Sequence, residues 1–380
     1  MKVRQLTRRK EYSETEDVLV AAKQRLRYLR TKFEHLVVAF SGGKDSLALL
    51  TLLEEVNKED GITEKVTCVF RDEEVINTSI VNFVQSVAES GRYNFFWMAY
   101  PMNVGFNLMG KYMPFTACGD DHKWHRQPPP YAIRSLGADT RKLDEWQVED
   151  LERKFLGGYG RTCILLGMRA AESFKRFTAL TSKEKDNWLS IKAKGHGRAS
   201  PLFDWEEFDV FKWFWESGTP YCPVYEAQMW VGTRLRVSSS LHDRAFQQLE
   251  KLKESEPLYY QQLLSVVPEL ETQLRYFKSI DVCAKIAGYP HTFEGLRAYI
   301  DDNIEEQYRP MAHKHVDIGE RMRSNRPNKR LGDIPLRYLF KEVLAGKYWG
   351  GFVTYREPSE EDIEFEKEAS WTTPSTLISP

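Results

Sequence analysis

The sequence predicts an α/β fold with a doubly wound parallel sheet, followed by a mostly helical C-terminal half. Three observations predict it: short apolar runs rich in β-branched residues, stretches with helical spacing of apolar residues between them, and a change after Pro201, where helical spacing predominates. Because strands alternate with helices, we expect right-handed crossovers and a parallel sheet covered on both faces.

The first strand is predicted at residues 35–40, an apolar run of the kind found in buried parallel strands. A glycine pair ends this run, and apolar residues then recur every three or four positions over 46–57, which predicts a helix. The same patterns predict further strands at 65–70, 93–100 and 161–167, and helices at 76–87 and 144–155. Residues 101–130 have no sustained period, so we expect a long loop there.

Composition limits the classes of protein to which the chain can belong. It has 380 residues, of which 42% are hydrophobic, and such a chain can bury a core, which excludes bulk disorder. The formal net charge is −1, so the overall charge favours neither a nucleic-acid nor a membrane partner. No apolar stretch approaches the roughly 18–20 residues that span a bilayer, and we expect a cytoplasmic protein without membrane contact.

The five cysteines are scattered along the chain, with no CxxC and no CC pair. This pattern argues against a disulfide framework and against an iron–sulfur cluster held by closely spaced cysteines. We therefore expect a reducing compartment and no iron–sulfur cluster.

The motif most indicative of chemistry lies where the first predicted strand meets its helix: Ala39, Phe40, Ser41, Gly42, Gly43, Lys44, Asp45 and Ser46. A glycine pair lets the backbone turn tightly and bring N–H groups close to an anion, and the helix N-terminus adds a positive dipole end. The serine hydroxyls and the lysine add donors that suit a pyrophosphate. The loop is neither a Walker A loop nor a G-x-G-x-x-G turn. The alternative is a turn whose polar residues merely cap a helix.

The hexapeptide SGGKDS resembles the PP-loop of the ATP pyrophosphatase superfamily, the nucleotide α-hydrolases. The resemblance implies a Rossmann-like fold of the adenine nucleotide α-hydrolase (HUP) type, with the β and γ phosphates of ATP on residues 41–46. It also implies that the α phosphorus stays open to attack, that Lys44 and Asp45 act in catalysis, and that Asp45 helps to hold Mg²⁺.

A second segment, residues 166–176, resembles the G-x-R-x-x-E-S-x-x-R segment of phosphoadenosine phosphosulfate (PAPS) reductases. By this resemblance Gly167 and Arg169 approach the nucleotide phosphates, with Arg169 as a third catalytic residue, while Glu172 and Arg176 are candidate substrate contacts. A guanidinium group can grip phosphate with two hydrogen bonds and stabilise charge that develops on the α phosphoryl group. The alternative is that Arg169 and Glu172 form a surface pair on a helix.

Residues 201–225 resemble the stretch of the same family that runs from PL-x-x-W to P-x-NP-x-Y. Their aromatic side chains recur at helical spacing, which is more typical of a core than of a site. We expect four of them to be mainly core residues: Trp205, Phe208, Phe211 and Trp215.

The resemblance covers about residues 30–230 and then departs. Sulfonucleotide reductases carry a catalytic cysteine in a C-terminal tail, whereas this sequence ends Leu-Ile-Ser-Pro, so a thiolate nucleophile has no evident carrier. The helical half instead resembles the PAPS-reductase-like proteins of phages and mobile elements, including the immunoglobulin-binding regulator group, and more distantly the DNA phosphorothioation ATP pyrophosphatases. That resemblance implies a ParB-like protein as a candidate partner.

Further candidates lie near the predicted nucleotide edge. Asp72 follows the second strand and is a candidate for the ribose or Mg²⁺, or only favours the N-terminus of the next helix. In the long loop, Lys123 and Arg126 are candidate contacts to a second phosphate or a sulfate, or belong to a solvated basic loop. The same loop holds a histidine pair that is weak as a metal site and a cysteine that is either a sulfur carrier or an unreactive thiol: His122, His125 and Cys118.

Two basic stretches, Lys192–Arg198 and Arg321–Arg330, are candidates for contact with nucleic-acid phosphates. The acidic stretch 357–368 leaves the alternative that it pairs with the second basic stretch inside the molecule.

The sequence thus predicts a PP-loop nucleotide-binding domain over 1–230, a helical domain over 231–356 and a mobile acidic and polar tail over 357–380. We expect an enzyme that cleaves ATP at the α phosphate with Mg²⁺, releases pyrophosphate and transfers an adenylyl group or sulfur to an acceptor. Two alternatives remain: a PAPS reductase or sulfotransferase with an unidentified cysteine, and a nucleotide-sensing regulatory module that acts with a ParB-like or DNA partner.

Overall fold

The fold is known from a computed structural model, and every structural statement below concerns the residues that it describes. These are residues 17–104, 106–108, 111–113, 115–120, 122, 125–143, 145–156, 160–172, 174–181, 187–191, 196–233, 235, 237, 249–278, 281–324, 334–346, 348, 353 and 358–371. They divide into two compact units, each described by itself. Unit 1 comprises 1–104, 116–240 and 251–260, and unit 2 comprises 105–115, 241–250 and 261–380.

Unit 1 is built around a six-stranded sheet with the strand order β3-β2-β1-β8-β10-β9. The strands are β1 (His35–Ala39), β2 (Thr67–Arg71), β3 (Asn94–Met98), β8 (Thr162–Leu166), β9 (Leu189–Ile191) and β10 (Gly197–Ala199). All neighbours pair in parallel except β9 and β10, which are antiparallel. The predicted α/β fold class is confirmed, and β1 lies at the centre, where the winding direction of the crossovers reverses.

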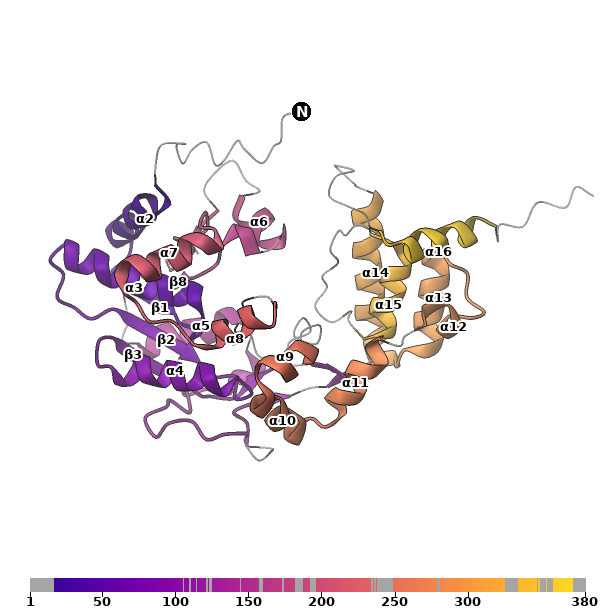
Figure 1. Ribbon diagram of the computed structural model, residues 1–380, viewed down its shortest axis with the longest axis horizontal. Helices are drawn as coiled ribbons and strands as arrows, with labels where there is room; N and C mark the ends of the chain where they lie inside the picture. Colours follow the sequence, from indigo (N-terminus) through magenta and orange to yellow (C-terminus); the bar gives the residue numbers. More distant parts are fainter. Residues whose placement is uncertain are drawn as a thin grey trace, which may run out of the picture. The chain divides into compact units, whose positions relative to one another are not determined.

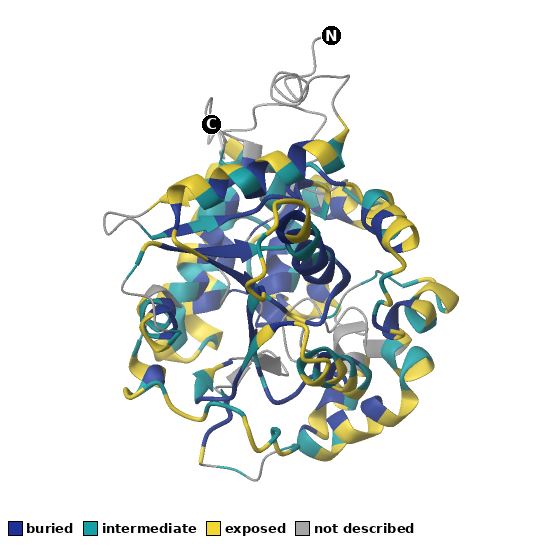
Figure 2. Cartoon of the chain, turned by 90° about the vertical axis from the view of Figure 1, so that its left-hand side faces the viewer, coloured by how far each residue is buried: buried dark blue, intermediate teal, exposed yellow. Residues whose placement is uncertain are grey.

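Helices cover both faces of this sheet, as Figure 1 shows. The helices of unit 1 are α2 (Val18–Lys32), α3 (Lys44–Glu59), α4 (Thr78–Glu89), α5 (Glu145–Phe155), α6 (Phe174–Thr181), α7 (Glu207–Ser217) and α8 (Val224–Trp230). Residues of α2, α3, α4 and α7 share one large apolar core with the sheet. A smaller core lies on the other face, where Val148 and Leu156 pack against sheet residues. In Figure 2 the buried sides of the helices accordingly face buried strands.

Helix boundaries follow local capping chemistry. The Asn77 side chain accepts a hydrogen bond from the Ser79 N–H at 2.8 Å and so starts α4. Helix α7 ends at Gly218, which has a φ of 65° and adopts the left-handed conformation that glycine tolerates best. These positions fix where each helix begins or ends.

Polar contacts fasten α5 to the sheet. Glu152 is buried and accepts hydrogen bonds from Arg71 at 2.6 and 2.8 Å and from the Tyr100 hydroxyl at 2.7 Å. Glu149 is buried as well and pairs with Arg198 of β10 at 2.5 Å. Buried carboxylates are tolerated when arginines and hydroxyls satisfy them, so these contacts hold α5 in register with three strands.

The segment predicted as a long loop, 101–130, contains short strands in its described parts. Strands β4 (Met102–Asn103) and β7 (Thr116–Ala117) form one antiparallel pair, which belongs to unit 1. Strands β5 (Phe106–Leu108) and β6 (Lys111–Met113) form a second pair, which belongs to unit 2. Pairs of two or three residues are too short to produce a detectable alternation in the sequence, which is why the pattern predicted a loop.

Helices dominate the rest of the chain. They are α9 (Leu249–Ser255), α10 (Pro257–Val266), α11 (Glu269–Lys278), α12 (Val282–Lys285), α13 (Phe293–Asn303), α14 (Arg309–Ser324), α15 (Leu336–Leu344) and α16 (Glu360–Trp371). Helices α12 to α16 enclose a core of their own that includes Leu296, Val316, Phe340 and Phe365. The expectation of a mobile tail over 357–380 is wrong for α16, because this helix buries Phe365 against that core. Among the described residues, no helix combines the length and apolar character needed to cross a membrane.

Candidate functional site

The motif at residues 39–46 forms the turn between β1 and the first turn of α3. Gly42 has a φ of 75°, and a methyl group on its Cα would lie 2.7 Å from Val84 and 2.8 Å from Ile80. Both the backbone conformation and the close approach of α4 therefore require glycine here. The Ser41 N–H donates to the Ser46 hydroxyl at 3.1 Å, so the loop closes on itself.

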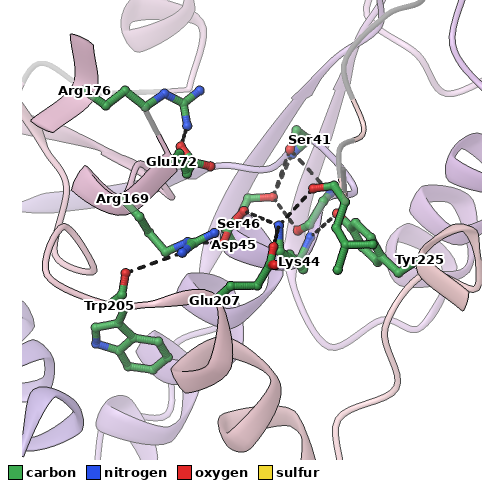
Figure 3. Close-up of polar contacts among 12 residues, drawn as sticks. Ser41, Lys44, Asp45, Ser46, Arg169, Glu172, Arg176, Trp205, Glu207 and Tyr225 are labelled. Carbon is green, nitrogen blue, oxygen red and sulfur yellow. Dashed lines mark hydrogen bonds and ion pairs between the residues drawn. The ribbon is translucent and has the colours of Figure 1, made fainter. Parts of the chain in front are cut away.

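Lys44 is the buried cation of this loop, with 3% of its surface exposed. Its Nζ lies 3.2 Å from an Asp45 carboxylate oxygen, 3.2 Å from a Glu207 carboxylate oxygen and 3.1 Å from the Leu235 carbonyl oxygen. Its backbone N–H donates to the Tyr225 hydroxyl at 2.7 Å. Figure 3 shows Lys44 between the side chains of Glu207 and Tyr225.

Asp45 connects the loop to the end of β8. Its Oδ1 accepts a hydrogen bond from Arg169 Nε at 2.5 Å, while its Oδ2 faces Lys44 (Figure 3). The approach needs a glycine at position 167, because a methyl group there would lie 2.6 Å from Ser46 N and 2.8 Å from Asp45 O. The structure therefore brings together Lys44, Asp45 and Arg169, which the sequence motifs placed more than 120 residues apart.

Arg169 is buried, with 3% of its surface exposed. A guanidinium group has five N–H donors. Among the described residues, only Asp45 and the Trp205 carbonyl oxygen, the latter at 3.4 Å, accept hydrogen bonds from it. The remaining donors of Arg169 are the chemistry that an anionic ligand requires.

Three groups of this site were missed from the sequence: the Tyr225 hydroxyl, the Glu207 carboxylate and the Leu235 carbonyl oxygen. They lie more than 160 residues beyond the loop, in a stretch whose spacing predicted core. Burial raises the pKa of Tyr225 well above its usual value, so the hydroxyl stays neutral. The only sequence signal for Tyr225 is its place in the P-x-x-P-x-Y segment.

A family comparison agrees with this geometry. Residues 35–292 match the family model of the phosphoadenosine phosphosulfate reductase domain, which covers more than half of the chain. The chain belongs to the phosphoadenosine phosphosulfate reductase family. The match includes the loop, Arg169 and Tyr225.

Individual relatives of this family member are more distant. The uncharacterized Escherichia coli (strain K12) protein YbdN is 29% identical over 234 residues, which cover 58% of this chain and 57% of YbdN. The chain thus spans less than two thirds of that curated relative. Among solved structures, the phosphoadenylyl-sulfate reductase of Candida auris, in a phosphate complex, is 15% identical with a TM-score of 0.35 and covers 58% of this chain and 88% of that one. The FMN adenylyltransferase of Candida glabrata with FMN and AMPCPP is 14% identical with a TM-score of 0.37, over 55% and 58% of the two chains.

Asp72, the candidate for the ribose or Mg²⁺, lies buried at the end of β2 in this PAPS reductase family member. Its carboxylate accepts hydrogen bonds from Trp97 Nε1 at 2.8 Å, from the Glu74 N–H at 2.8 Å and from Arg126. Arg126, a predicted substrate contact, is therefore the counter-ion of Asp72 in this structure. A role of either residue toward a ligand remains a prediction.

Cys118 lies in the same cluster. Its N–H donates to Glu74 at 2.8 Å, and its thiol contacts the Asp72 carbonyl oxygen at 3.3 Å. Burial raises the pKa of the thiol, which disfavours the thiolate that a sulfur carrier needs. Of the two expectations for Cys118, the geometry favours the unreactive thiol.

The histidine pair does not form a metal site in the described part of the chain. His122 Nε2 lies 3.0 Å from the Glu74 carboxylate, whereas His125 contacts the same carboxylate through its backbone N–H at 2.7 Å. No group of three or more His, Cys, Asp or Glu side chains among the described residues could hold a metal ion. Lys123 lies outside the described residues.

The other candidates fall away from the loop contacts. Glu172 and Arg176 form an ion pair with each other, as the helical alternative predicted for this segment (Figure 3). In the first basic stretch, 192–195 lie outside the described residues and Arg198 pairs with Glu149 of α5. In the second, 325–330 lie outside the described residues, and Arg323 pairs with Glu366 at 2.8 Å, as the acidic stretch allowed.

The expected core role holds for only part of the aromatic stretch. Trp205 is 1% exposed and Phe211 packs against the core, but Phe208 and Trp215 are 78% and 88% exposed. The buried face of α7 consists instead of Val210, Trp213 and Phe214. Helical spacing alone does not say which of two aromatic faces turns inward.

Proposed function

We propose that this protein binds ATP, or a related adenine nucleotide, on the loop at residues 41–46 and cleaves it at the α phosphate to release pyrophosphate. One observation carries the proposal: the loop at the end of β1, Lys44, Asp45 and Arg169 converge on one point at the carboxyl edge of the sheet. In open α/β sheets ligands bind at this edge, where the strand order reverses. The family match supports an adenine nucleotide as the ligand.

In this proposal the loop holds the β and γ phosphates. The backbone N–H groups at the start of α3 and the serine hydroxyls donate to phosphate oxygens, while Lys44 supplies a positive charge. Fixing two phosphates leaves the α phosphorus at the mouth of the loop. Catalysis of this kind depends mainly on positioning and electrostatics.

Arg169 acts on the α phosphoryl group. Its Nε is held by Asp45 at 2.5 Å, which fixes the guanidinium plane, and donors not used by the described residues remain for an anion. A fixed cation at this position stabilises the charge that develops on the α phosphoryl oxygens as the bond to pyrophosphate breaks.

The residues present suit one Mg²⁺ ion. This cation usually takes one or two carboxylates, with phosphates and water completing its shell. The Asp45 side chain is 15% exposed at the edge of the loop and is the carboxylate that would hold it. When bound, Mg²⁺ would neutralise charge on the leaving pyrophosphate.

The acceptor of the adenylyl group or sulfur belongs to the same proposal. The described cysteines of unit 1 are buried, and burial raises the pKa of Cys163 to about 12 and of Cys222 to about 11. A thiolate on this unit is thus disfavoured as a nucleophile, so we propose that the acceptor supplies the attacking group.

The test is incubation with α-labelled ATP and Mg²⁺, with separation of the labelled products. We expect AMP or an adenylylated acceptor together with pyrophosphate, and a loss of at least about 100-fold in Asp45→Asn, because the variant loses the carboxylate that fixes Arg169. Arg92→Ala is the control, since this arginine is 52% exposed and pairs with Glu54 away from the loop. ADP and phosphate as products would refute the proposal. Tight ATP binding with no pyrophosphate release, with or without a ParB-like or DNA partner, would favour the regulatory alternative instead.

A further inference from the structure

The strongest phosphate donors of the loop already have acceptors within the protein. A lysine ammonium group has three N–H donors. For Lys44 three protein oxygens lie within reach, from Asp45, Glu207 and Leu235, at 3.1 to 3.2 Å. The Lys44 backbone N–H is also used, by the Tyr225 hydroxyl at 2.7 Å. A phosphate oxygen can reach these donors only by replacing a protein oxygen.

The same segment also covers the loop sterically. A methyl group on Gly43 would lie 2.5 Å from Val237 Cγ2 and 3.2 Å from the Tyr225 hydroxyl, so both side chains lie directly against the glycine. Phosphate binding at a glycine-rich loop requires the anion to approach this backbone closely. Tyr225 and Val237 therefore stand where an anion would approach Gly43.

The acceptors are chemically suited to exchange with phosphate. The Tyr225 hydroxyl stays neutral because burial raises its pKa, so it offers a lone pair to the N–H without bringing a charge. Glu207 carries the charge, and its side chain is 50% exposed, which lets it turn into water when a phosphate arrives. Lys44 itself is 3% exposed, so water has little access to its donors.

We propose that Glu207, Tyr225 and the Leu235 carbonyl form a built-in acceptor set that occupies the phosphate donors of Lys44 until a polyphosphate displaces it. This inference rests on the proposed function and adds the regulation of its site. A diphosphate can replace the oxygens at both the N–H and the Nζ of Lys44, whereas one phosphate must leave part of the set in place. The acceptor set therefore favours ligands with linked phosphates over inorganic phosphate.

The test measures binding of inorganic pyrophosphate, and separately of inorganic phosphate, by titration calorimetry on the full chain. Tyr225→Phe leaves the Lys44 N–H without its acceptor, so we expect pyrophosphate to bind about tenfold more tightly, although the free protein becomes less stable. Glu207→Gln removes the competing charge, and we expect about two- to fivefold tighter binding, an effect that shrinks at high salt.

Two matched controls separate this effect from general changes. Tyr221→Phe removes a hydroxyl from a ring that stacks on Phe214 in the same cluster. Glu216→Gln removes a carboxylate that is also 50% exposed on the same helix α7. Both controls should bind pyrophosphate as the unmodified protein does.

The direction of the change decides the outcome. Lower stability with tighter pyrophosphate binding in Tyr225→Phe supports the acceptor set, because a purely structural role would weaken both. Equal or weaker pyrophosphate binding in both variants, with binding intact in the unmodified protein, overturns the inference and leaves the proposed function standing. Failure of the unmodified protein and of all variants to bind pyrophosphate overturns the proposed function itself.

Discussion

The close approach of β8 to the loop makes Gly167→Ala the most direct test of the site geometry. The added methyl group would lie 2.6 Å from Ser46 N, 2.7 Å from Asp45 C and 2.8 Å from Asp45 O, all of them backbone atoms. Ordinary contacts begin near 3.4 Å, so the end of the strand and α3 must separate by up to about 0.8 Å. Backbone atoms cannot rotate away, so this separation has to move Asp45 relative to Arg169.

The size of the effect follows from two opposing contributions. Overpacking of this kind costs about 1–3 kcal/mol of stability. Alanine also restricts the unfolded chain more than glycine does, which offsets about 0.4–1 kcal/mol. We therefore expect the free energy of unfolding of unit 1 to fall by about 0.5–2.5 kcal/mol. A displacement approaching 1 Å at the reacting groups can also reduce the rate of pyrophosphate release by about 100-fold.

Urea unfolding followed by tryptophan fluorescence, with pyrophosphate release measured on the same preparation, would check both numbers. Gly319→Ala is the control, because a methyl group there would meet Leu339 Cδ1 at 2.8 Å, the movable end of a side chain in unit 2. That variant should retain full pyrophosphate release. Unchanged stability and full activity in Gly167→Ala would show that the close approach of strand and loop is not required.

Two further predictions concern unit 1. Trp205→Ala should lower the free energy of unfolding by about 3–5 kcal/mol because Trp205 is 1% exposed, whereas Trp215→Ala, at an 88% exposed position, should change it by no more than about 0.5 kcal/mol; equal losses in denaturant unfolding would contradict the described faces of α7. Burial raises the pKa of Cys222 to about 11 from an unfolded value of about 9, so the thiol ionises more readily in the unfolded chain, and stability present below pH 9 should fall as pH rises toward 11. Cys222→Ala should flatten this decline in unfolding curves at several pH values, with Cys283→Ala, an exposed position, as the control, and an identical decline in all three proteins would refute the assignment.

Local sequence patterns were sufficient for the central strands and for the loop. The runs at 35–40 and 161–167 correspond to β1 and β8, because buried parallel strands are apolar on both faces. The glycine pair marked the turn because Gly42 needs both a positive φ and a position without a side chain. Strands β9 and β10 gave no signal, since three residues each are too few to show a period.

The rest of the site depends on tertiary contacts that spacing does not encode. Glu207 and Tyr225 reach Lys44 only because α7 and α8 return over α3, and their local sequence looks like core. Asp72 was placed correctly after β2, but its buried partners Trp97 and Arg126 come from segments with no recognisable link to it. Position at a strand end therefore predicted where the carboxylate lies, and its partners decide what it contacts.

The hairpin β5–β6 has a practical consequence for dissecting this chain. It lies between two stretches of unit 1 in the sequence, yet it belongs to unit 2, where β5 contacts α11. A fragment cut after residue 240 would carry the hairpin without the helix it rests on, and a fragment begun at 241 would lack the hairpin altogether. Deletion experiments that assign binding to one half of the molecule must therefore move residues 105–115 together with the C-terminal helices.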